Sequence, residues 1–311
     1  MSESSSFMLG CNYLYGENGF GADPKKALEH FKDAVRTEND PDAKFALGLC
    51  YEFGYGAQPN AQTAFKWYTE ASDGGSADAC CNLGSCYERG FGCARDTRLA
   101  YRFYAKANAL CKEQTGKCHA VALSNMGAMF GDGSGRTQNV VKSIEMLSDA
   151  ADNGSASAFY NLAYCYLEGI GVNKDPNEAY RYFDEADRLG SPEASHMLSM
   201  AYDSGYLGND PAKAFCYCEK AAQGEIAEAM MDLVRYYSKG IGTAKNDKKA
   251  YFWCLKAEKA GSSDALFRLG YFCEKGIGVA PDKQRALNYY QAALKKGVTR
   301  ARSACERLKN G

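Results

Sequence analysis

The stretch SASAFYNLAYCYLEGIGVNKDPNEAYRYFDEADRLG at Ser155–Gly190 contains the pattern of two short amphipathic helices and a turn between them. In its first half, Ala158, Leu162 and Cys165 recur at helical spacing, which predicts one apolar stripe along one face of a helix. Gly169 is expected to end this helix, because glycine accepts the positive φ angle that a tight reversal needs.

A second helix is expected to begin at Asp175-Pro176. An aspartate side chain accepts hydrogen bonds from the free N–H groups of a first turn, and proline suits the first helical position. Ala179, Phe183 and Ala186 then form a second apolar stripe. Each helix is about 12 residues long and marginal by itself. The hairpin therefore needs a neighbour that covers its apolar face.

The same unit recurs along the chain with a nearly constant period. Its turn glycines are Gly19/Gly21, Gly54/Gly56, Gly90/Gly92, Gly133/Gly135, Gly169/Gly171, Gly205/Gly208, Gly240/Gly242 and Gly276/Gly278. A fixed period of about 36 residues is typical of stacked helical hairpins. We expect eight hairpins, at residues 5–38, 41–75, 76–117, 118–154, 155–190, 191–224, 225–261 and 262–297. Capping residues precede proline at five expected helix starts: Asp23-Pro24, Asp40-Pro41, Asp175-Pro176, Ser191-Pro192 and Asp210-Pro211.

Each expected first helix has one anchor residue that faces its hairpin partner. The anchors are Leu9, Leu47, Leu83, Met126, Leu162, Leu198, Leu233 and Leu269. A small residue usually follows the anchor and allows close helix approach, but Val234 breaks this rule and predicts a slightly splayed seventh hairpin. The second helices carry aromatic residues that we expect to fill the space between hairpins: Phe31, Trp67/Tyr68, Phe103/Tyr104, Tyr182/Phe183, Tyr217, Phe252/Trp253 and Tyr289/Tyr290.

Two segments depart from the regular unit. Seven extra residues fall within Leu110–Lys117, before the fourth hairpin, and they either extend a helix or form a loop. Residues 298–309 have the pattern of one more helix, with Ala301, Ala304 and Leu308 on its inner side. A final helix with a polar outer face is expected to cap a stack of repeats.

The eighth unit carries the repeating motif most plainly, as Ala265, Leu269-Gly270, Gly276-Ile-Gly278-Val279, Asp282, Ala286, Tyr289-Tyr290, Ala292-Ala293 and Gly297. This pattern resembles the Sel-1-like repeat, a relative of the tetratricopeptide repeat, and it covers nearly the whole chain. The resemblance implies an all-α fold, a right-handed α/α superhelical solenoid of eight antiparallel helix hairpins plus a C-terminal capping helix. It also implies a single domain over residues 5–311 that acts as an adaptor for other proteins.

Composition limits the classes of partner. The chain has 46% hydrophobic residues and a formal net charge of -1. Because charge is near balance and no long basic run occurs, we expect no nucleic-acid partner and no membrane partner. Residues 1–6 lack the basic and apolar segments of a signal peptide, so a cytoplasmic location is expected. We expect a monomer that binds another protein or a peptide, with self-association left open.

The fourteen cysteines are expected to be reduced. Cys50, Cys86 and Cys165 occupy one repeat position on the buried stripe, where a thiol acts as a small hydrophobic group. Cys111 and Cys118 have six residues between them and flank a junction between helices. They are the one pair for which a disulfide is left open.

No motif indicates a metal site, a cofactor or a catalytic residue. His30, His119 and His196 lie in separate repeats, without a His-Glu-x-x-His or Cys-x-x-Cys pair. A Gly-x-Ser-x-Gly elbow and a Ser-x-x-Lys pair are also absent from the sequence. The resemblance implies one alternative, because cysteine-rich members of the family include β-lactam-binding proteins and weak β-lactamases. Their helix-bridging cysteine pairs resemble Cys111 and Cys118 in spacing, but they occur once per repeat.

A binding surface is expected on the first helices. At 100° per residue, the positions two before, two after and five after each anchor point away from the hairpin partner. The position five after is Glu52, Glu88 and Glu274 in three repeats, but this strip is otherwise largely apolar and aromatic. An exposed patch of that kind usually marks an interaction site.

The candidate binding residues come from this strip and from the asparagines one position before an anchor, whose amides are suited to a peptide backbone. They are Phe45, Leu49, Asn82, Ser85, Asn125, Tyr160, Asn161, Tyr164, His196, Met200, Met231, Arg235, Phe267 and Tyr271. The alternative is that successive first helices touch, so that the same aromatic residues belong to the core.

Overall fold

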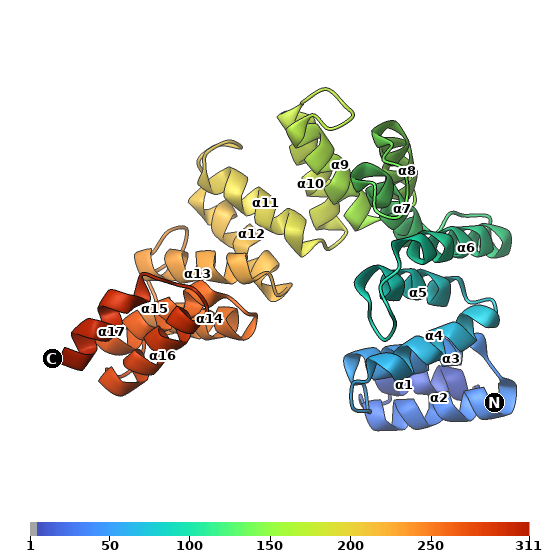
Figure 1. Cartoon of the computed structure of the whole chain (residues 1–311), viewed down its shortest axis with the longest axis horizontal. Helices are drawn as coiled ribbons and strands as arrows, with labels where there is room; N and C mark the ends of the chain where they lie inside the picture. Colours follow the sequence, from blue (N-terminus) through green and yellow to red (C-terminus); the bar gives the residue numbers. More distant parts are fainter. Residues whose placement is uncertain (1–4, 311) are drawn as a thin grey trace. The chain divides into compact units, whose positions relative to one another are not determined.

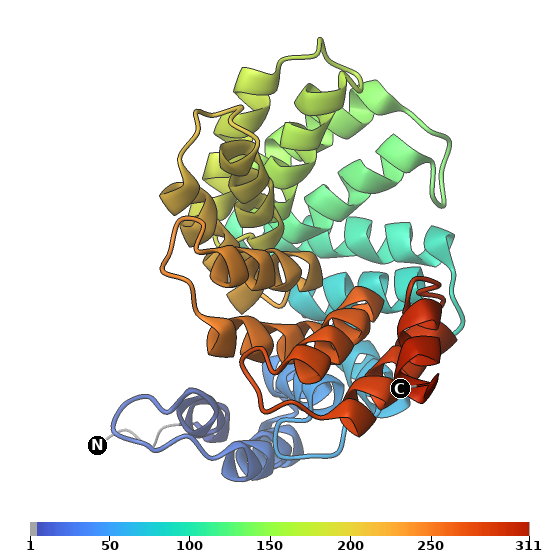
Figure 2. The same ribbon diagram turned by 90° about the vertical axis from the view of Figure 1, so that its left-hand side faces the viewer.

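The computed structural model describes residues 5–310, which form seventeen α-helices and no β-strand (Figures 1 and 2). In chain order they are α1 (Ser6–Tyr15), α2 (Pro24–Glu38), α3 (Pro41–Phe53), α4 (Ala61–Asp73), α5 (Ala77–Arg89), α6 (Thr97–Thr115), α7 (Ala120–Asp132), α8 (Val140–Asp152), α9 (Ala156–Glu168), α10 (Pro176–Arg188), α11 (Pro192–Asp203), α12 (Pro211–Gln223), α13 (Ala227–Lys239), α14 (Asp247–Lys259), α15 (Ser263–Lys275), α16 (Lys283–Lys295) and α17 (Ala301–Asn310). The expected all-α repeat architecture is confirmed.

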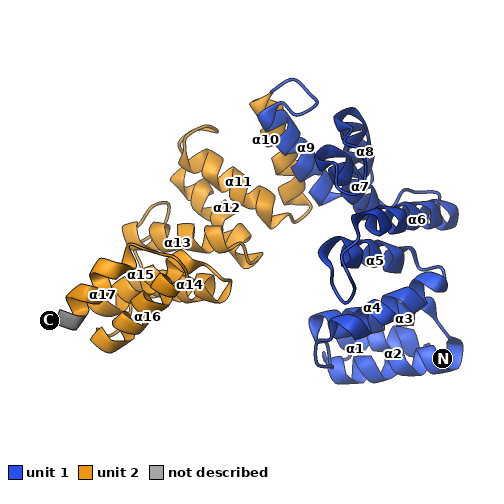
Figure 3. Cartoon of the chain, viewed as in Figure 1, with its two compact units in different colours: residues 1–174 blue, residues 175–311 orange. Residues whose placement is uncertain are grey.

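The chain forms two compact units, residues 1–174 and residues 175–311 (Figure 3). In the first unit the hairpins are α1–α2, α3–α4, α5–α6 and α7–α8, followed by α9. In the second unit, α10 precedes the hairpins α11–α12, α13–α14 and α15–α16 and the final helix α17. Within each unit, every second helix packs on the first helix of the next hairpin. The boundary falls inside the expected fifth hairpin, and a single domain over the whole chain stays a prediction.

The helix starts follow the sequence signals. At all five Asp-Pro and Ser-Pro pairs the first residue caps a helix and the proline opens it. At the start of α3, for example, the Asp40 carboxylate accepts from the backbone N–H of Asp42 at 2.8 Å. These side chains satisfy backbone donors that have no partner within the helix.

The first turn differs from the expected Gly19/Gly21 pair. Helix α1 ends at Tyr15 and is capped by Gly16, whose φ is 71°, and Asn18 takes the next left-handed position with φ 54°. In six other turns the second glycine comes two residues after the glycine that caps the first helix, and Asn18 takes that position here. Asparagine is tolerated there because its short polar side chain accepts left-handed backbone better than most other non-glycine residues do. Gly19 has the expected positive φ, at 84°, whereas Gly21 is outside that region.

Close packing within a hairpin depends on a glycine that faces a tyrosine. A Cβ atom on Gly84 would lie 2.5 Å from the ring of Tyr104, and the same contact would be 2.3 Å between Gly48 and Tyr68. No such approach is possible for a larger residue without movement of the ring. The tyrosine ring therefore fills the space that the missing side chain leaves.

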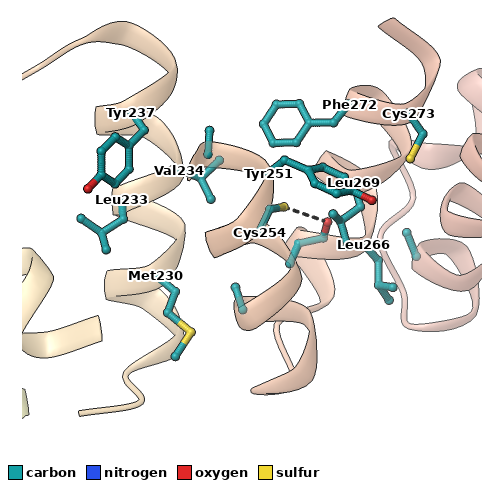
Figure 4. Close-up of a cluster of buried hydrophobic side chains, with 14 of the residues drawn as sticks. Met230, Leu233, Val234, Tyr237, Tyr251, Cys254, Leu266, Leu269, Phe272 and Cys273 are labelled. Atoms are coloured by element: carbon teal, nitrogen blue, oxygen red, sulfur yellow. Dashed lines mark hydrogen bonds between the residues drawn. The ribbon is translucent and has the colours of Figure 1, made fainter. Parts of the chain in front are cut away.

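In the seventh hairpin, the larger side chain lies at the glycine position and the smaller one at the tyrosine position. Val234 of α13 takes the glycine position, and Cys254 of α14 takes the tyrosine position; both are buried in the same core (Figure 4). The Cys254 thiol donates to the carbonyl of Ala265 in the next hairpin at 3.5 Å. Because the smaller cysteine makes room for the valine, the expected splay has no steric cause.

Three buried tyrosines of the second helices, Tyr68, Tyr104 and Tyr290, each have a glutamate partner. Tyr68 and Tyr104 donate to Glu52 and Glu88, each at 2.6 Å. Burial raises the pKa of both phenols, and the carboxylate partners raise it further. The same bond occurs in the eighth hairpin, where Tyr290 donates to Glu274 at 3.0 Å.

The expectation that Glu52, Glu88 and Glu274 face away from the hairpin is therefore wrong. A phenol at the end of a buried ring costs free energy unless it has an acceptor. The glutamates at this position turn back over the second helix and supply that acceptor.

The extra residues before the fourth hairpin extend a helix. Helix α6 has nineteen residues, compared with thirteen in most of the others, and it ends at Thr115. Its last turn is attached to the preceding hairpin, because the Gln114 side chain donates to the carbonyl of Gly75 at 2.9 Å.

Helix α17 covers the last hairpin as expected, although it begins at Ala301 and not at residue 298. Ala301, Ala304 and Cys305 are buried, and Leu308 is half-buried; the side chain of Lys309 lies outside the described residues. Arg307 forms an ion pair with Glu274 of α15, with Nη2 and Oε2 2.8 Å apart. This pairing and those with Lys275 and Tyr290 lower the pKa of Glu274 to about 2.

The size exchange predicts a compensating pair of substitutions. Gly84→Val is expected to destabilise the first unit by about 1–3 kcal/mol, because the new side chain enters the space of the Tyr104 ring. Adding Tyr104→Cys, as found beside Val234, is expected to recover part of that loss. Urea unfolding followed by circular dichroism checks both, with Gly21→Ala as a control in open space. A double variant less stable than Gly84→Val alone would contradict the size exchange.

The Glu274–Arg307 pair predicts a pH-dependent contribution of α17. The folded pKa of Glu274 is about 2 and its ordinary value is 4.5, so the stabilisation is complete above about pH 4.5 and is lost as pH falls towards 2. Arg307→Gln is expected to lower the urea midpoint at pH 7. The difference in urea midpoint between this variant and the wild type is expected to shrink as pH falls from about 4.5 to about 2. Arg302→Gln, an exposed change on the same helix, is the control. Equal midpoints for the two variants at neutral pH would rule the contribution out.

Candidate protein-interaction face

We use first-helix face for the surface of α1, α3, α5, α7 and α9 in the first unit, and of α11, α13 and α15 in the second unit, that lies opposite the hairpin partners. In the first unit, part of the expected binding strip is packed. The ring of Phe45 lies 5.8 Å from that of Tyr68, and Leu49 contacts the same buried cluster. At Phe45 and Leu49 the alternative interpretation therefore applies: these side chains take part in packing.

Two of the candidate asparagines of the first unit, Asn82 and Asn125, are already engaged. The Asn82 amide forms a side-chain hydrogen bond with the Tyr68 hydroxyl of the preceding hairpin, which lowers the pKa of that phenol against the larger effects of burial and Glu52. Asn125 acts on Tyr104 in the same way. These amides connect successive hairpins through the Tyr–Glu pairs.

The other candidates of the first unit differ in exposure. Ser85, Tyr160 and Asn161 are half-buried, whereas Tyr164 is 47% exposed. Tyr164 is therefore the most accessible of the candidates that α9 provides.

In the second unit, the structure brings three candidates together around a hollow of about 660 Å³. His196 and Met200 come from α11, and Met231 comes from α13. Met200 is 42% exposed, and Met231 is half-buried against the core. The start of α15 and the residues before it close the hollow on the side away from α11.

Carboxylates line the same hollow. Glu228, Asp232 and Asp264 contribute to its wall. The Asp232 carboxylate lies 3.2 Å from His196 Nε2, within hydrogen-bond distance. The Asp264 carboxylate forms an ion pair with Arg300 at 2.6 Å. No ion pair of Glu228 is present among the described residues.

The sequence interpretation missed these three acids. Asp232 stands one position before its anchor, the position that Asn82 and Asn125 occupy in the first unit. The same positional rule would have included it, had the rule not been restricted to amides.

The remaining candidates of the second unit lie along the same face. Arg235 pairs with Asp203 of the preceding first helix at 2.8 Å. The Arg300 guanidinium lies 4.6 Å from the ring centre of Phe267, which also packs on Tyr290. Tyr271 is 37% exposed. Charged side chains thus connect successive first helices while Met200 and Tyr271 stay accessible.

One serine–lysine contact resembles a catalytic pair in distance. The Lys106 ammonium lies 3.0 Å from the Ser72 hydroxyl and 3.1 Å from the Ser72 carbonyl oxygen. Ser72 is buried, and its hydroxyl also contacts the Cys80 thiol at 3.0 Å. Lys106 donates to the last turn of α4, so the contact acts as a helix C-terminal cap.

All fourteen cysteines are free thiols, Cys111 and Cys118 included. Burial raises the pKa of Cys50 to about 11 and that of Cys86 to about 12. Cys165 is only half-buried. Residues 5–310 contain no cluster of three or more His, Cys, Asp or Glu side chains placed to hold a metal ion. Nor does any helix in that range combine the length and the apolar character needed to span a bilayer.

Comparison with known proteins finds the Sel1 repeat along most of the chain. The family model matches residues 4–36, 41–76, 77–110, 120–155, 156–191, 192–225, 227–262 and 263–298. Among curated proteins, chitin synthase regulatory factor 2 of Schizosaccharomyces pombe is 30% identical over 128 residues, which are 39% of this chain and 25% of that protein. Chitin synthase regulatory factor 3 of the same yeast is 27% identical over 241 residues, 75% of this chain and 21% of that protein. The chain matches only about a quarter of the length of these relatives.

Solved structures share the architecture. A Sel1 repeat protein from Oxalobacter formigenes has a TM-score of 0.64 and 25% identity, over 97% of this chain and 86% of that one. A protective antigen of uropathogenic Escherichia coli has a TM-score of 0.51 and 26% identity, over 97% and 71% of the two chains. Yeast Tom70, at 18% identity and a TM-score of 0.56, covers 99% of this chain and 64% of its own and shares the fold alone.

Thiol exposure predicts an order of chemical labelling. Cys216 is exposed on α12, whereas Cys50 and Cys86 are buried with raised pKa values. Because the thiolate is the reactive form, Ellman's reagent is expected to modify Cys216 first and the buried pair only on unfolding. Cys216→Ser is expected to remove the fastest step. A fast step that persists in this variant would contradict the assignment.

Proposed function

Because the chain belongs to the Sel1 repeat family, we propose that it is a non-catalytic scaffold that binds another protein through its first-helix face. Stacked helical repeats of this kind provide extended surfaces on which partner proteins bind. Two curated relatives are named as regulatory factors of chitin synthase, which is compatible with action through binding.

The observation that supports this function best is the hollow around His196, Met200 and Met231. It combines the exposed Met200 and the half-buried Met231 with polar groups that converge on one space, the usual character of a binding site. Methionine side chains adapt to partners of different shape. The nearby carboxylates of Glu228 and Asp232 offer acceptors to the backbone N–H groups of a bound segment.

Two further parts of the proposal concern the state of the chain. Fourteen free thiols favour a reducing compartment, in agreement with action in the cytoplasm. The catalytic alternative, β-lactam binding or hydrolysis, gains no support from Cys111 and Cys118, which are unbridged, or from Ser72, which is buried.

Site-specific photo-crosslinking tests the binding face. Benzoylphenylalanine in place of Met200 is expected to give a discrete adduct with one partner protein in extracts of the native cell. The same probe in place of Val141, an exposed residue on α8 away from the face, is expected to give none. A further variant, Met200→Glu, is expected to weaken capture of that partner without a change in the circular dichroism spectrum.

Two results would overturn the proposal. One is the absence of an adduct from probes at Tyr164, Met200 and Tyr271, in chains that are folded by circular dichroism. The other is sustained turnover of nitrocefin by the purified chain, which would favour the catalytic alternative.

A further inference from the structure

The near-neutral charge of the whole chain conceals two regions of opposite sign. Residues 245–311 contain fifteen Lys and Arg and only six Asp and Glu. Residues 175–232, in contrast, contain four Lys and Arg and twelve Asp and Glu. Both regions belong to the second unit. A surface formed by α14, α16 and α17 therefore attracts anionic groups, although the chain as a whole does not.

One face of α14 concentrates this charge around an aromatic side chain. Lys248, Phe252, Lys256 and Lys259 follow helical spacing along it, and all four are exposed. Phe252 was expected to fill space between hairpins, but it is 51% exposed. The Lys256 ammonium lies 5.9 Å from the centre of the Phe252 ring. The Trp253 ring packs edge to face against the same ring, with the two ring centres 5.5 Å apart.

Beside this face lies a pocket of about 450 Å³ between the end of α12 and the second half of α14. Phe252, Trp253, Lys256 and Lys259 line it together with Met230, a core residue of α13. Glu225 is the one carboxylate residue in its lining. The pocket thus combines an apolar, aromatic wall with two ammonium groups.

The ammonium groups are available to a ligand. Within the described residues, Lys248, Lys256 and Lys259 form no ion pair, in contrast to the arginines of the first-helix face. An anionic group in the pocket would pair with them without displacing an existing carboxylate. Such pairs between unlike charges raise both the association rate and the selectivity of binding.

We propose that this α14 pocket binds an acidic segment of a partner protein, with an apolar or aromatic side chain of that segment against Phe252 and Trp253. The apolar wall favours a peptide over a nucleic acid or a lipid surface, because phosphate backbones are held by a continuous basic track. Glu225 and Glu258 interrupt such a track here. The site lies on the second helices and is separate from the first-helix face of the proposed function.

Tryptophan fluorescence provides a direct test, because the chain has only Trp67 and Trp253. In the variant Trp67→Phe, Trp253 is the single reporter and lines the pocket. The peptide Ac-EDELFDEE-NH2 is expected to change its emission saturably, whereas the neutral peptide Ac-NQNLFNQQ-NH2 is not. Raising salt from roughly 50 mM to roughly 500 mM is expected to weaken binding, since salt screens exposed charges.

Matched variants assign the effect to the pocket. Phe252→Ala and Lys256→Glu are each expected to lower the affinity for the acidic peptide by about tenfold, equivalent to about 1.4 kcal/mol. Lys295→Glu makes the same charge change at an exposed site of α16 outside the pocket. This variant is expected to lower the affinity for the acidic peptide far less. If the Trp67→Phe chain does not fold, anisotropy of a labelled peptide with the wild-type chain replaces the fluorescence readout.

Three outcomes would overturn the proposal. The first is no binding of the acidic peptide to a folded chain. The second is equal weakening by Lys256→Glu and Lys295→Glu, which would indicate general charge attraction. The third is that oligothymidylate or phosphatidylserine vesicles bind the pocket and the peptide does not. Each result is independent of crosslinking at Met200, so the two sites succeed or fail separately.

Discussion

Each hairpin of this chain is stable only because the next one covers its apolar face. Most of its helices have thirteen residues, a length at which an isolated helix in water is marginal. Second helices pack on the following first helices throughout each unit, and α17 gives the last hairpin the same cover. Burial of apolar surface between neighbours is therefore the interaction on which the helices, their turns and every surface described above depend.

Polar groups make this packing specific. A tyrosine ring fills the space over a glycine, its hydroxyl reaches a glutamate of the same hairpin, and an asparagine of the next hairpin approaches the same hydroxyl, as for Tyr68, Glu52 and Asn82. Arg89 adds an ion pair to Glu52 from the following hairpin at 3.3 Å. Because buried phenols and carboxylates cost free energy without partners, such groups favour one register between neighbouring hairpins over others.

Residues that neither pack nor pair between hairpins stay available for binding. On the first helices of the second unit, Met200 and the hollow beside it stay open while Arg235 and Arg300 connect the helices. On the second helices, the aromatic residues are buried or half-buried, with the exception of Phe252. The two surfaces differ in charge, the first lined with carboxylates and the second with ammonium groups, which suits them to different partners.

The sequence by itself determined the helices, their caps, the period and the family, because glycine, proline and apolar spacing act over a few residues and recur in every repeat. It also contained the charge asymmetry, which only a count by region reveals. The tertiary structure decided which way side chains turn between repeats. Glu52 faces inward, Phe45 is packed and Phe252 is exposed, and these outcomes depend on which groups the neighbouring hairpin presents. Helical periodicity assigns a residue to a face, but only the adjoining hairpin determines whether that face is covered.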